Sequence, residues 1–170
     1  YDACYCPDDS IIFVSTATMN GVPCIRGGSP IGNLYRRKTD GTIERLTNDQ
    51  DHDWHPTVLP NGRIMYLRWD YTDTPHAFNR IMFSMNPDGT RQMVLYGNQI
   101  NHGTILAPKS VPRSPKLVVT WSPGHGMREH YGKTALIDPR LGPDDPKGVQ
   151  YIRQGNIHCD PWAFSEDHFI

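Results

Sequence analysis

Histidine and cysteine side chains recur at one position of a repeating pattern along this chain. Cys24, His76 and His130 each follow the start of a strongly apolar segment by 13 or 14 residues, and His125 lies close to the third of them. Imidazole and thiolate groups are ligands that suit zinc, copper or iron. The spacing therefore indicates a candidate site for zinc or another transition metal at Cys24, His76, His125 and His130, with ordinary surface histidines as the alternative.

The four cysteines form neither a CxxC pair nor a CxxCH motif. The sequence therefore contains no haem attachment motif and no zinc ribbon. Cys4 and Cys6 flank one residue of an expected strand, so their side chains should point to the same face. Buried free thiols or one disulfide are expected, and the spacing leaves the pairing open.

Aromatic side chains cluster near two of the expected strand ends. The candidate ligand-binding residues are Trp54, His55, Trp69, Tyr71 and Asp73. Aromatic rings beside a few polar groups can form a platform for a ligand or a sugar. The alternative is that the tryptophans pack between neighbouring sheets.

Four carboxylates lie in the same segments, at Asp51, Asp53, Asp70 and Asp73. Such groups could bind Ca²⁺ or act as acid and base in glycoside chemistry. Solvated loop acids are the simpler expectation. No GxSxG elbow and no P-loop spacing occurs, so no catalytic residue is assigned.

The composition limits the kinds of partner. The chain has 170 residues, with 17 Lys and Arg against 18 Asp and Glu. This balance argues against a nucleic-acid partner and a polybasic membrane anchor. No apolar run reaches the roughly 18 residues of a membrane span. The 15 glycines and 15 prolines favour a turn-rich β protein of one domain, expected to be a piece of a longer chain.

An internal repeat organises these residues. A polar turn opens into a strongly apolar segment at 11–15, 64–68, 117–121 and 169–170, at intervals of 53, 53 and 52 residues. Between these segments, pairs of expected strands flank turns such as Asp40-Gly41 and Asp88-Gly89. Asp-Gly turns between β-rich runs are strong hairpin signals.

Four short antiparallel strands in each unit of about 50 residues are typical of a β-propeller blade. The expected fold is all-β, with blades at 2–47, 55–96 and 107–153 and the start of a fourth at 161–170. The first strand of each unit is expected at 2–6, 55–59, 107–111 and 161–164. Propellers close with about four to eight blades, so other segments of a longer chain or other subunits should complete the ring.

In such blades, the long loops between the second and third strands, and between one blade and the next, share one end of the domain. Seven of the eight histidines fall in or beside these loops. Binding residues concentrate on loops that a rigid scaffold holds. This end is therefore the expected ligand face.

Leu34-Tyr35, Asp40-Gly41 and Arg45-Leu46-Thr47 resemble TolB-like, PD40-type propeller repeats. A longer set of segments resembles the propeller part of hydrazine synthase alpha-subunit-like proteins: 21–24, 33–35, 49–52, 56–59, 68–73, 75–76 and 85–90. The resemblance implies a propeller domain of an exported bacterial protein, in the periplasm or outside the cell.

Two functions follow as expectations. The first is a non-catalytic binding or scaffold domain of a larger exported protein. The alternative is the propeller portion of a haem- or metal-containing oxidoreductase, whose cofactor is held partly by other segments. A third hypothesis is a carbohydrate-active propeller, which would use the four loop carboxylates named above as acid and base.

Overall fold

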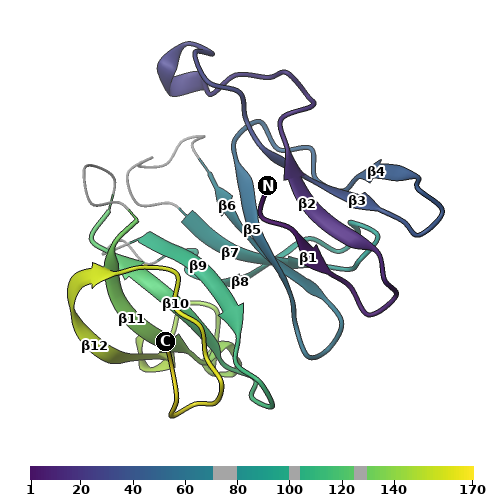
Figure 1. Cartoon of the computed structure of the whole chain (residues 1–170). Helices are drawn as coiled ribbons and strands as arrows, with labels where there is room; N and C mark the ends of the chain where they lie inside the picture. Colours follow the sequence, from purple (N-terminus) through teal and green to yellow (C-terminus); the bar gives the residue numbers. More distant parts are fainter. Residues whose placement is uncertain (71–79, 100–103, 125–129) are drawn as a thin grey trace.

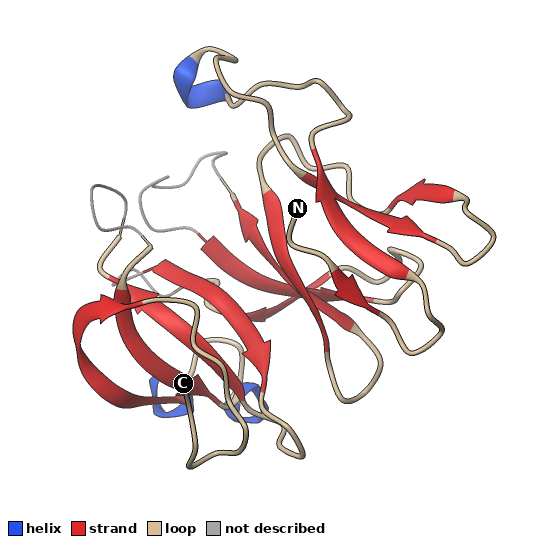
Figure 2. Cartoon of the chain, viewed as in Figure 1, coloured by secondary structure: helices blue, strands red, loops and turns tan. Residues whose placement is uncertain are grey.

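Three four-stranded antiparallel sheets make up most of the chain (Figures 1 and 2). The computed structural model describes residues 1–70, 80–99, 104–124 and 130–170. In each sheet the strands follow one another in chain order, as in a propeller blade. The all-β, propeller-type prediction is therefore confirmed.

The strands have the following bounds. The first sheet contains β1 (Cys4–Tyr5), β2 (Ile11–Ser15), β3 (Asn33–Arg37) and β4 (Ile43–Arg45). The second contains β5 (Asp53–Val58), β6 (Ile64–Trp69), β7 (Arg80–Met85) and β8 (Met93–Tyr96). The third contains β9 (Thr104–Ser110), β10 (Leu117–Ser122), β11 (Gly132–Ile137) and β12 (Val149–His158). Three short 3-10 turns are η1 (Pro23–Ile25), η2 (Pro139–Leu141) and η3 (Pro146–Gly148). Within the described ranges, no helix is long and apolar enough to cross a bilayer.

The sheets pack face to face through apolar side chains. Ile64 and Tyr66 of β6 lie in a core cluster with Ile12, Val14 and other residues of the first sheet. Met65 and Leu67, which alternate with them, join a second cluster with residues of the third sheet. A strand that is covered on both faces needs apolar residues at every position. This explains why the predicted strand is continuously apolar over 64–67.

The last ten residues pair with one another beside the third sheet. Ala163 and Phe169 form an antiparallel bridge, and Trp162 and Ile170 exchange two backbone hydrogen bonds of 2.9 Å. Ala163 packs on Val111 and neighbouring apolar residues of the third sheet. The segment thus forms an antiparallel hairpin against that sheet, where a further blade is expected.

Some strand bounds differ from the prediction. The innermost strand of the first sheet covers only Cys4–Tyr5, and that of the third covers Thr104–Ser110 instead of 107–111. A bulge interrupts the pairing of β9 with β10, which obscures the alternating pattern in the sequence. The third blade was expected to end at residue 153, but β12 continues to His158, which pairs with Gly132.

Candidate functional site

The same backbone irregularity recurs within β5 and β9, just before β1 and in the segment after β12. Asp2, His55, Ala107 and Asp160 have φ values of 49°, 51°, 46° and 46°, at intervals of 53, 52 and 53 residues. Non-glycine residues seldom adopt this left-handed conformation. In β5 it coincides with a shift of register between Trp54 and Thr57. The backbone therefore turns at the same place in each repeat.

Hydrogen bonds link these positions from one blade to the next. The carboxylate of Asp2 accepts from the backbone N–H of His55 at 3.4 Å, and Nδ1 of His55 accepts from the backbone N–H of Ala107 at 3.3 Å. Burial lowers the pKa of His55, while the charges of Asp2 and Asp160 oppose that shift. His55 is therefore a neutral imidazole at pH 7, and its accepting Nδ1 assigns the ring proton to Nε2.

A cavity of about 570 Å³ follows the innermost strands, and we call it the axial cavity. Its walls include Asp2, His55, Lys109, Asp160 and Trp162. The ammonium of Lys109 lies 5.9 Å from the centre of the Trp162 ring. Groups of both charges line this cavity, so it favours neither anions nor cations.

A second cavity of about 350 Å³ opens at the end where the long loops gather, and we call it the mouth pocket. Residues of all three sheets or their flanking loops line it. They include His52, Trp54, His55, Trp69, Arg80 and His130. Asp2 and His55 line both cavities, so these two residues lie at the boundary between them.

The wall of the mouth pocket combines a buried cation with aromatic rings. Arg80, at the start of β7, is only 5% exposed. Its guanidinium carbon lies 5.6 Å from the ring centre of Trp54 and 5.8 Å from that of Trp69. Attraction to the ring faces offsets part of the cost of burying the charge. Burial lowers the pKa of Arg80 to about 10, so the group is still a cation at pH 7.

His52 completes this aromatic cluster. Its ring stacks on Trp69 with centres 5.8 Å apart and planes at 8°, and it makes an edge-type contact with Trp54, with centres 5.0 Å apart and planes at 62°. Nδ1 of His52 accepts a hydrogen bond of 3.0 Å from the backbone N–H of Gly32. Burial, and then the charge of Arg80, lower the pKa of His52. A neutral imidazole therefore stands beside a fixed guanidinium.

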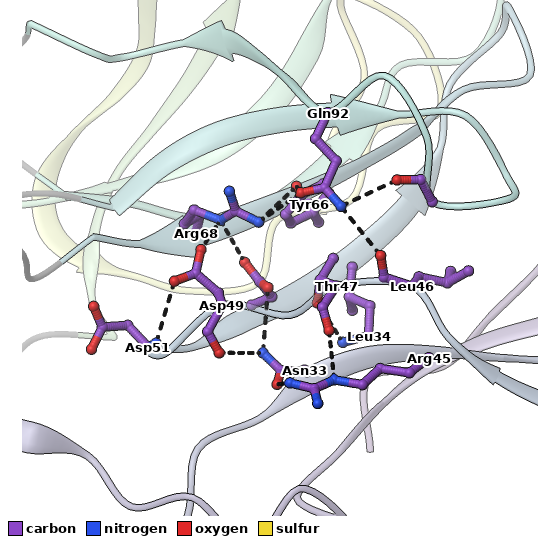
Figure 3. Close-up of polar contacts among 12 residues, drawn as sticks. Asn33, Leu34, Arg45, Leu46, Thr47, Asp49, Asp51, Tyr66, Arg68 and Gln92 are labelled. Carbon is purple, nitrogen blue, oxygen red and sulfur yellow. Dashed lines mark hydrogen bonds and ion pairs between the residues drawn. The ribbon is translucent and has the colours of Figure 1, made fainter.

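A separate polar cluster joins the first and second sheets (Figure 3). Nε of Arg68 lies 2.5 Å from Asp49 and 3.0 Å from Asp53. The Arg68 guanidinium also donates to Gln92 at 2.9 Å, and Gln92 donates to the Leu46 carbonyl at 3.2 Å. These contacts connect the second sheet to the segment that follows β4.

Two of the four carboxylates expected to be solvated loop acids are buried instead. Asp53 is 0% exposed and Asp51 is 1% exposed. Burial raises the pKa of Asp53 to about 6, and Arg68 opposes that shift. The expectation of solvated acids was wrong for both residues. For Asp53 the reason is that Arg68 of the adjacent strand pairs with it, and a paired carboxylate can be buried. Asp70 is half-buried, and Asp73 lies outside the described residues.

The structure brings together three of the predicted ligand-face residues, since Trp54, His55 and Trp69 all line the mouth pocket. Trp69 also packs against Val22 and Ile31 of the first blade's long loop, so packing and pocket lining coexist. Tyr71 and Asp73 lie outside the described residues.

Of the predicted metal ligands, His130 lines the mouth pocket. Cys24 lies in η1, where only its backbone is described. His76 and His125 fall outside the described residues. Within the part of the chain that is described, no group of three or more His, Cys, Asp or Glu side chains could hold a metal ion. The metal site therefore stays a prediction. Cys4, Cys6 and Cys159 are free thiols, and Cys159 is exposed.

Sequence reasoning missed Arg80 and His52 as pocket residues. Arg80 directly precedes the apolar run Ile81-Met82-Phe83, where a cation is unusual because a strand buried on both faces otherwise needs apolar residues. A cation beside this apolar run was the sequence signal that could have identified Arg80. No sequence signal indicated that His52 would stack on Trp69.

No protein-family model and no curated protein sequence matches this chain. Solved structures do. A hydrazine synthase from Kuenenia stuttgartiensis superposes with a TM-score of 0.75 at 18% identity, over 94% of this chain and 24% of that chain. A structure described as TolB from Agrobacterium tumefaciens superposes with a TM-score of 0.59 at 15% identity. The match covers 90% of this chain and 50% of that chain. The tricorn protease superposes with a TM-score of 0.57 at 13% identity, and the match covers 92% of this chain and 13% of that chain. The chain therefore has the β-propeller fold and spans about a quarter of the hydrazine synthase chain.

Proposed function

We propose that this chain is a non-catalytic β-propeller binding domain of a larger exported protein, and that the mouth pocket holds its ligand. The observation that carries this proposal is the pocket itself. Residues of three successive blades line it at the end where the loops gather. Its volume of about 350 Å³ and its mixture of indole rings with a few polar groups are typical of small-molecule sites.

The partners that we propose are further blades, supplied by other segments of a longer chain or by other subunits. The face of the first sheet that points away from the second supports this. Phe13 and Tyr35 stack there at 6.0 Å, and Tyr5 and Ile43 are 76% and 58% exposed. The rings at the matching positions of the second sheet, Tyr66 and Phe83, are covered by the first sheet. By the repeat, another blade should cover the Phe13–Tyr35 face.

The resemblance to TolB-like repeats supports export to the periplasm or the cell exterior. Fractionation of the native cells, with the protein detected by antibody, tests this location. Recovery with the cytosol would contradict it.

Ligand binding can be tested by filling the pocket. His130 is an exposed residue of the pocket wall, whereas its neighbour Tyr131 is 46% exposed and does not line the pocket. Ligand-observed NMR with indole, benzamide and benzoate should detect binding to the wild type and to Tyr131→Trp. His130→Trp should weaken it strongly because the new ring occupies the cavity. Equal binding by all three proteins, or none by any, would contradict the proposal.

A second candidate function is the propeller portion of a haem- or metal-containing oxidoreductase. The superposition on a hydrazine synthase favours it. Elemental analysis and an absorption spectrum of the longest chain that contains these residues would test it. Stoichiometric zinc, copper or iron, or a haem spectrum, would support this role, and an empty preparation would contradict it.

A further inference from the structure

A further pocket, of about 220 Å³, lies between the second and third sheets, and we call it the junction pocket. Its apolar lining consists of three leucines and three prolines: Leu59, Leu95, Leu117, Pro60, Pro115 and Pro139. The leucines belong to, or pack against, the core cluster that joins the two sheets. The gaps in the described ranges adjoin the opposite ends of β6, β9 and β10. The junction pocket is therefore separate from the mouth pocket.

The corresponding place between the first and second sheets is filled by the side chain of Arg36. Its guanidinium donates to the carbonyl of Pro87 at 3.1 Å and pairs with the carboxylate of Asp8. The Arg36 side chain is only 13% exposed. Pro87 follows β7 by two residues, as Pro139 follows β11, and Asp8 precedes Asn61 by 53 residues. Pro139 and Asn61 both line the junction pocket.

The second sheet has a short side chain where the first sheet has Arg36. Arg36 pairs with Ile12 across the ladder of β2 and β3. Ser84 pairs with Met65, which lies 53 residues after Ile12, across the ladder of β6 and β7. The Ser84 hydroxyl accepts from the guanidinium of Arg63 at 3.2 Å and so ends within the second sheet. The repeat therefore fills the first junction with a long side chain and leaves the second junction open.

The polar residues of the junction pocket also differ in charge from those of the first junction. Asn61 stands where the first junction has Asp8, and Arg140 stands where it has Asp88. Arg140 is paired with Asp138 through bonds of 2.9 and 2.6 Å. The described lining thus combines apolar surface, an amide and a balanced ion pair. Such a lining favours an uncharged ligand, because a charged one would lose its hydration without gaining a counter-charge.

Size and the remaining polar groups indicate an aromatic ring with a hydroxyl. An apolar cavity of roughly 150 Å³ holds benzene, so a pocket of about 220 Å³ accommodates one substituted ring. Arg140 is bonded to Asp138 along its edge, through Nε and a terminal nitrogen, and a guanidinium held in this way can still stack on an aromatic face. The Pro139 carbonyl accepts from Gly142 at 3.3 Å and has a second lone pair for a ligand donor.

We infer that the junction pocket binds a small uncharged aromatic molecule of the phenol class. The ring packs on the leucines and against Arg140, and the hydroxyl donates to the carbonyl of Pro139. In the first junction, the guanidinium of Arg36 donates in the same way to the carbonyl of Pro87. This site does not depend on the function proposed for the mouth pocket.

Phenol itself is the probe, and the leucine methyl groups of the wild-type protein report where it binds. Methyl signals, assigned by single Leu→Ile substitutions, would be followed by NMR as phenol is added. The signals of Leu59, Leu95 and Leu117 should shift. Leu46 is the matched control, since it follows the strand partner of Arg36 by two residues, as Leu95 follows that of Ser84. Its signal should stay unchanged.

Two further probes test the class of the ligand. Phenol should bind about threefold more tightly than cyclohexanol, because an aromatic ring gains attraction to the guanidinium of Arg140 at an exposed site. Benzylamine should bind more weakly than phenol, since its ammonium loses hydration in an apolar pocket. Equal or tighter binding of cyclohexanol or benzylamine would overturn the assignment of the ligand class.

A substitution at the rim tests the pocket itself. Asn61→Trp adds a ring to an exposed residue of the wall and should weaken phenol binding strongly. Asp40→Trp is the matched control, because Asp40 is also exposed and its side chain, like that of Asn61, accepts from the backbone N–H two residues on. Equal phenol binding by the two variants would contradict the proposal. Circular dichroism verifies their folds.

The methyl signals also separate this site from the mouth pocket. A shift of Leu106, which lines the mouth pocket, without a shift of Leu95 would place phenol there. That result would overturn the junction site and leave the proposed function standing. No shift at Leu59, Leu95 or Leu117 would likewise overturn the junction site.

Discussion

Nδ1 of His55 accepts a hydrogen bond of 3.3 Å from the backbone N–H of Ala107, so a side chain of the second blade is tied to the backbone of the third. The two residues occupy the same repeat position, 52 residues apart, and both have positive φ. The carboxylate of Asp2 makes the corresponding bond to the backbone of His55. The inner strands are thus connected in sequence around the axial cavity.

Loss of the hydrogen bond between His55 and Ala107 should destabilise the domain. Replacement of His55 by alanine should therefore cost more stability than replacement by asparagine. His55→Ala loses the acceptor and places alanine at a φ of 51°, for a combined cost of about 2 kcal/mol. His55→Asn keeps an acceptor and tolerates the left-handed conformation, so its cost should be smaller. Urea unfolding measures both. Equal losses in the two variants would mean that the contact to Ala107 contributes little.

Arg68 should be required to keep Asp53 buried. Arg68→Met leaves a carboxylate that is 0% exposed without its arginine partner, and breaking such a pair costs about 3–5 kcal/mol. Exposed Arg37 is the matched control, and Arg37→Met should cost within about 0.5 kcal/mol. Adding Asp53→Asn to Arg68→Met should recover part of the loss. A loss below about 1 kcal/mol for Arg68→Met would contradict this account.

His52 should make the stability depend on pH. Its pKa in the folded state lies below the usual value of about 6.5, so below pH 6.5 the unfolded chain binds more protons. Its contribution is therefore present at neutral pH and is lost as the pH falls through 6.5 toward the folded pKa. Asp53, whose pKa is raised to about 6, acts in the opposite direction.

A comparison with His52→Asn isolates the histidine, because asparagine can still accept from Gly32 but does not titrate. The stability difference between the wild type and His52→Asn should shift against the wild type between pH 7 and pH 5. Urea titrations at four pH values measure it. A difference that stays constant with pH would contradict the prediction.

Two glycines should respond differently to alanine. At Gly132 a Cβ atom would lie 2.2 Å from the Trp121 carbonyl oxygen, so β10 or β11 would have to move. We expect Gly132→Ala to cost about 3 kcal/mol, as in severe overpacking. At Gly41 the φ of +88° is strained for alanine, but nothing lies within 4 Å, so the cost should be near 1 kcal/mol. Thermal unfolding compares them, and the reverse order would be inconsistent with this packing.

The sequence was informative where a local rule operates. Asp40-Gly41 and Asp88-Gly89 predicted the hairpins because glycine there has positive φ, and the apolar run at 64–67 indicated a strand covered on both faces. The burial of Asp53 could not be predicted, since it depends on Arg68 of the adjacent strand. Arg80 was missed for a similar reason, because its place in the pocket depends on how Trp54 and Trp69 meet in space.

The most direct test of the binding site uses the four tryptophans of the chain. Trp54 and Trp69 line the mouth pocket, Trp162 lines the axial cavity, and Trp121 lies in a core between the second and third sheets. Indole N–H signals, assigned by single Trp→Phe substitutions, would be followed by NMR as benzoate is added. A ligand in the mouth pocket should shift the signals of Trp54 and Trp69 and leave Trp121 and Trp162 unchanged. A shift confined to Trp162, or no shift at all, would contradict the assignment of the mouth pocket as the binding site.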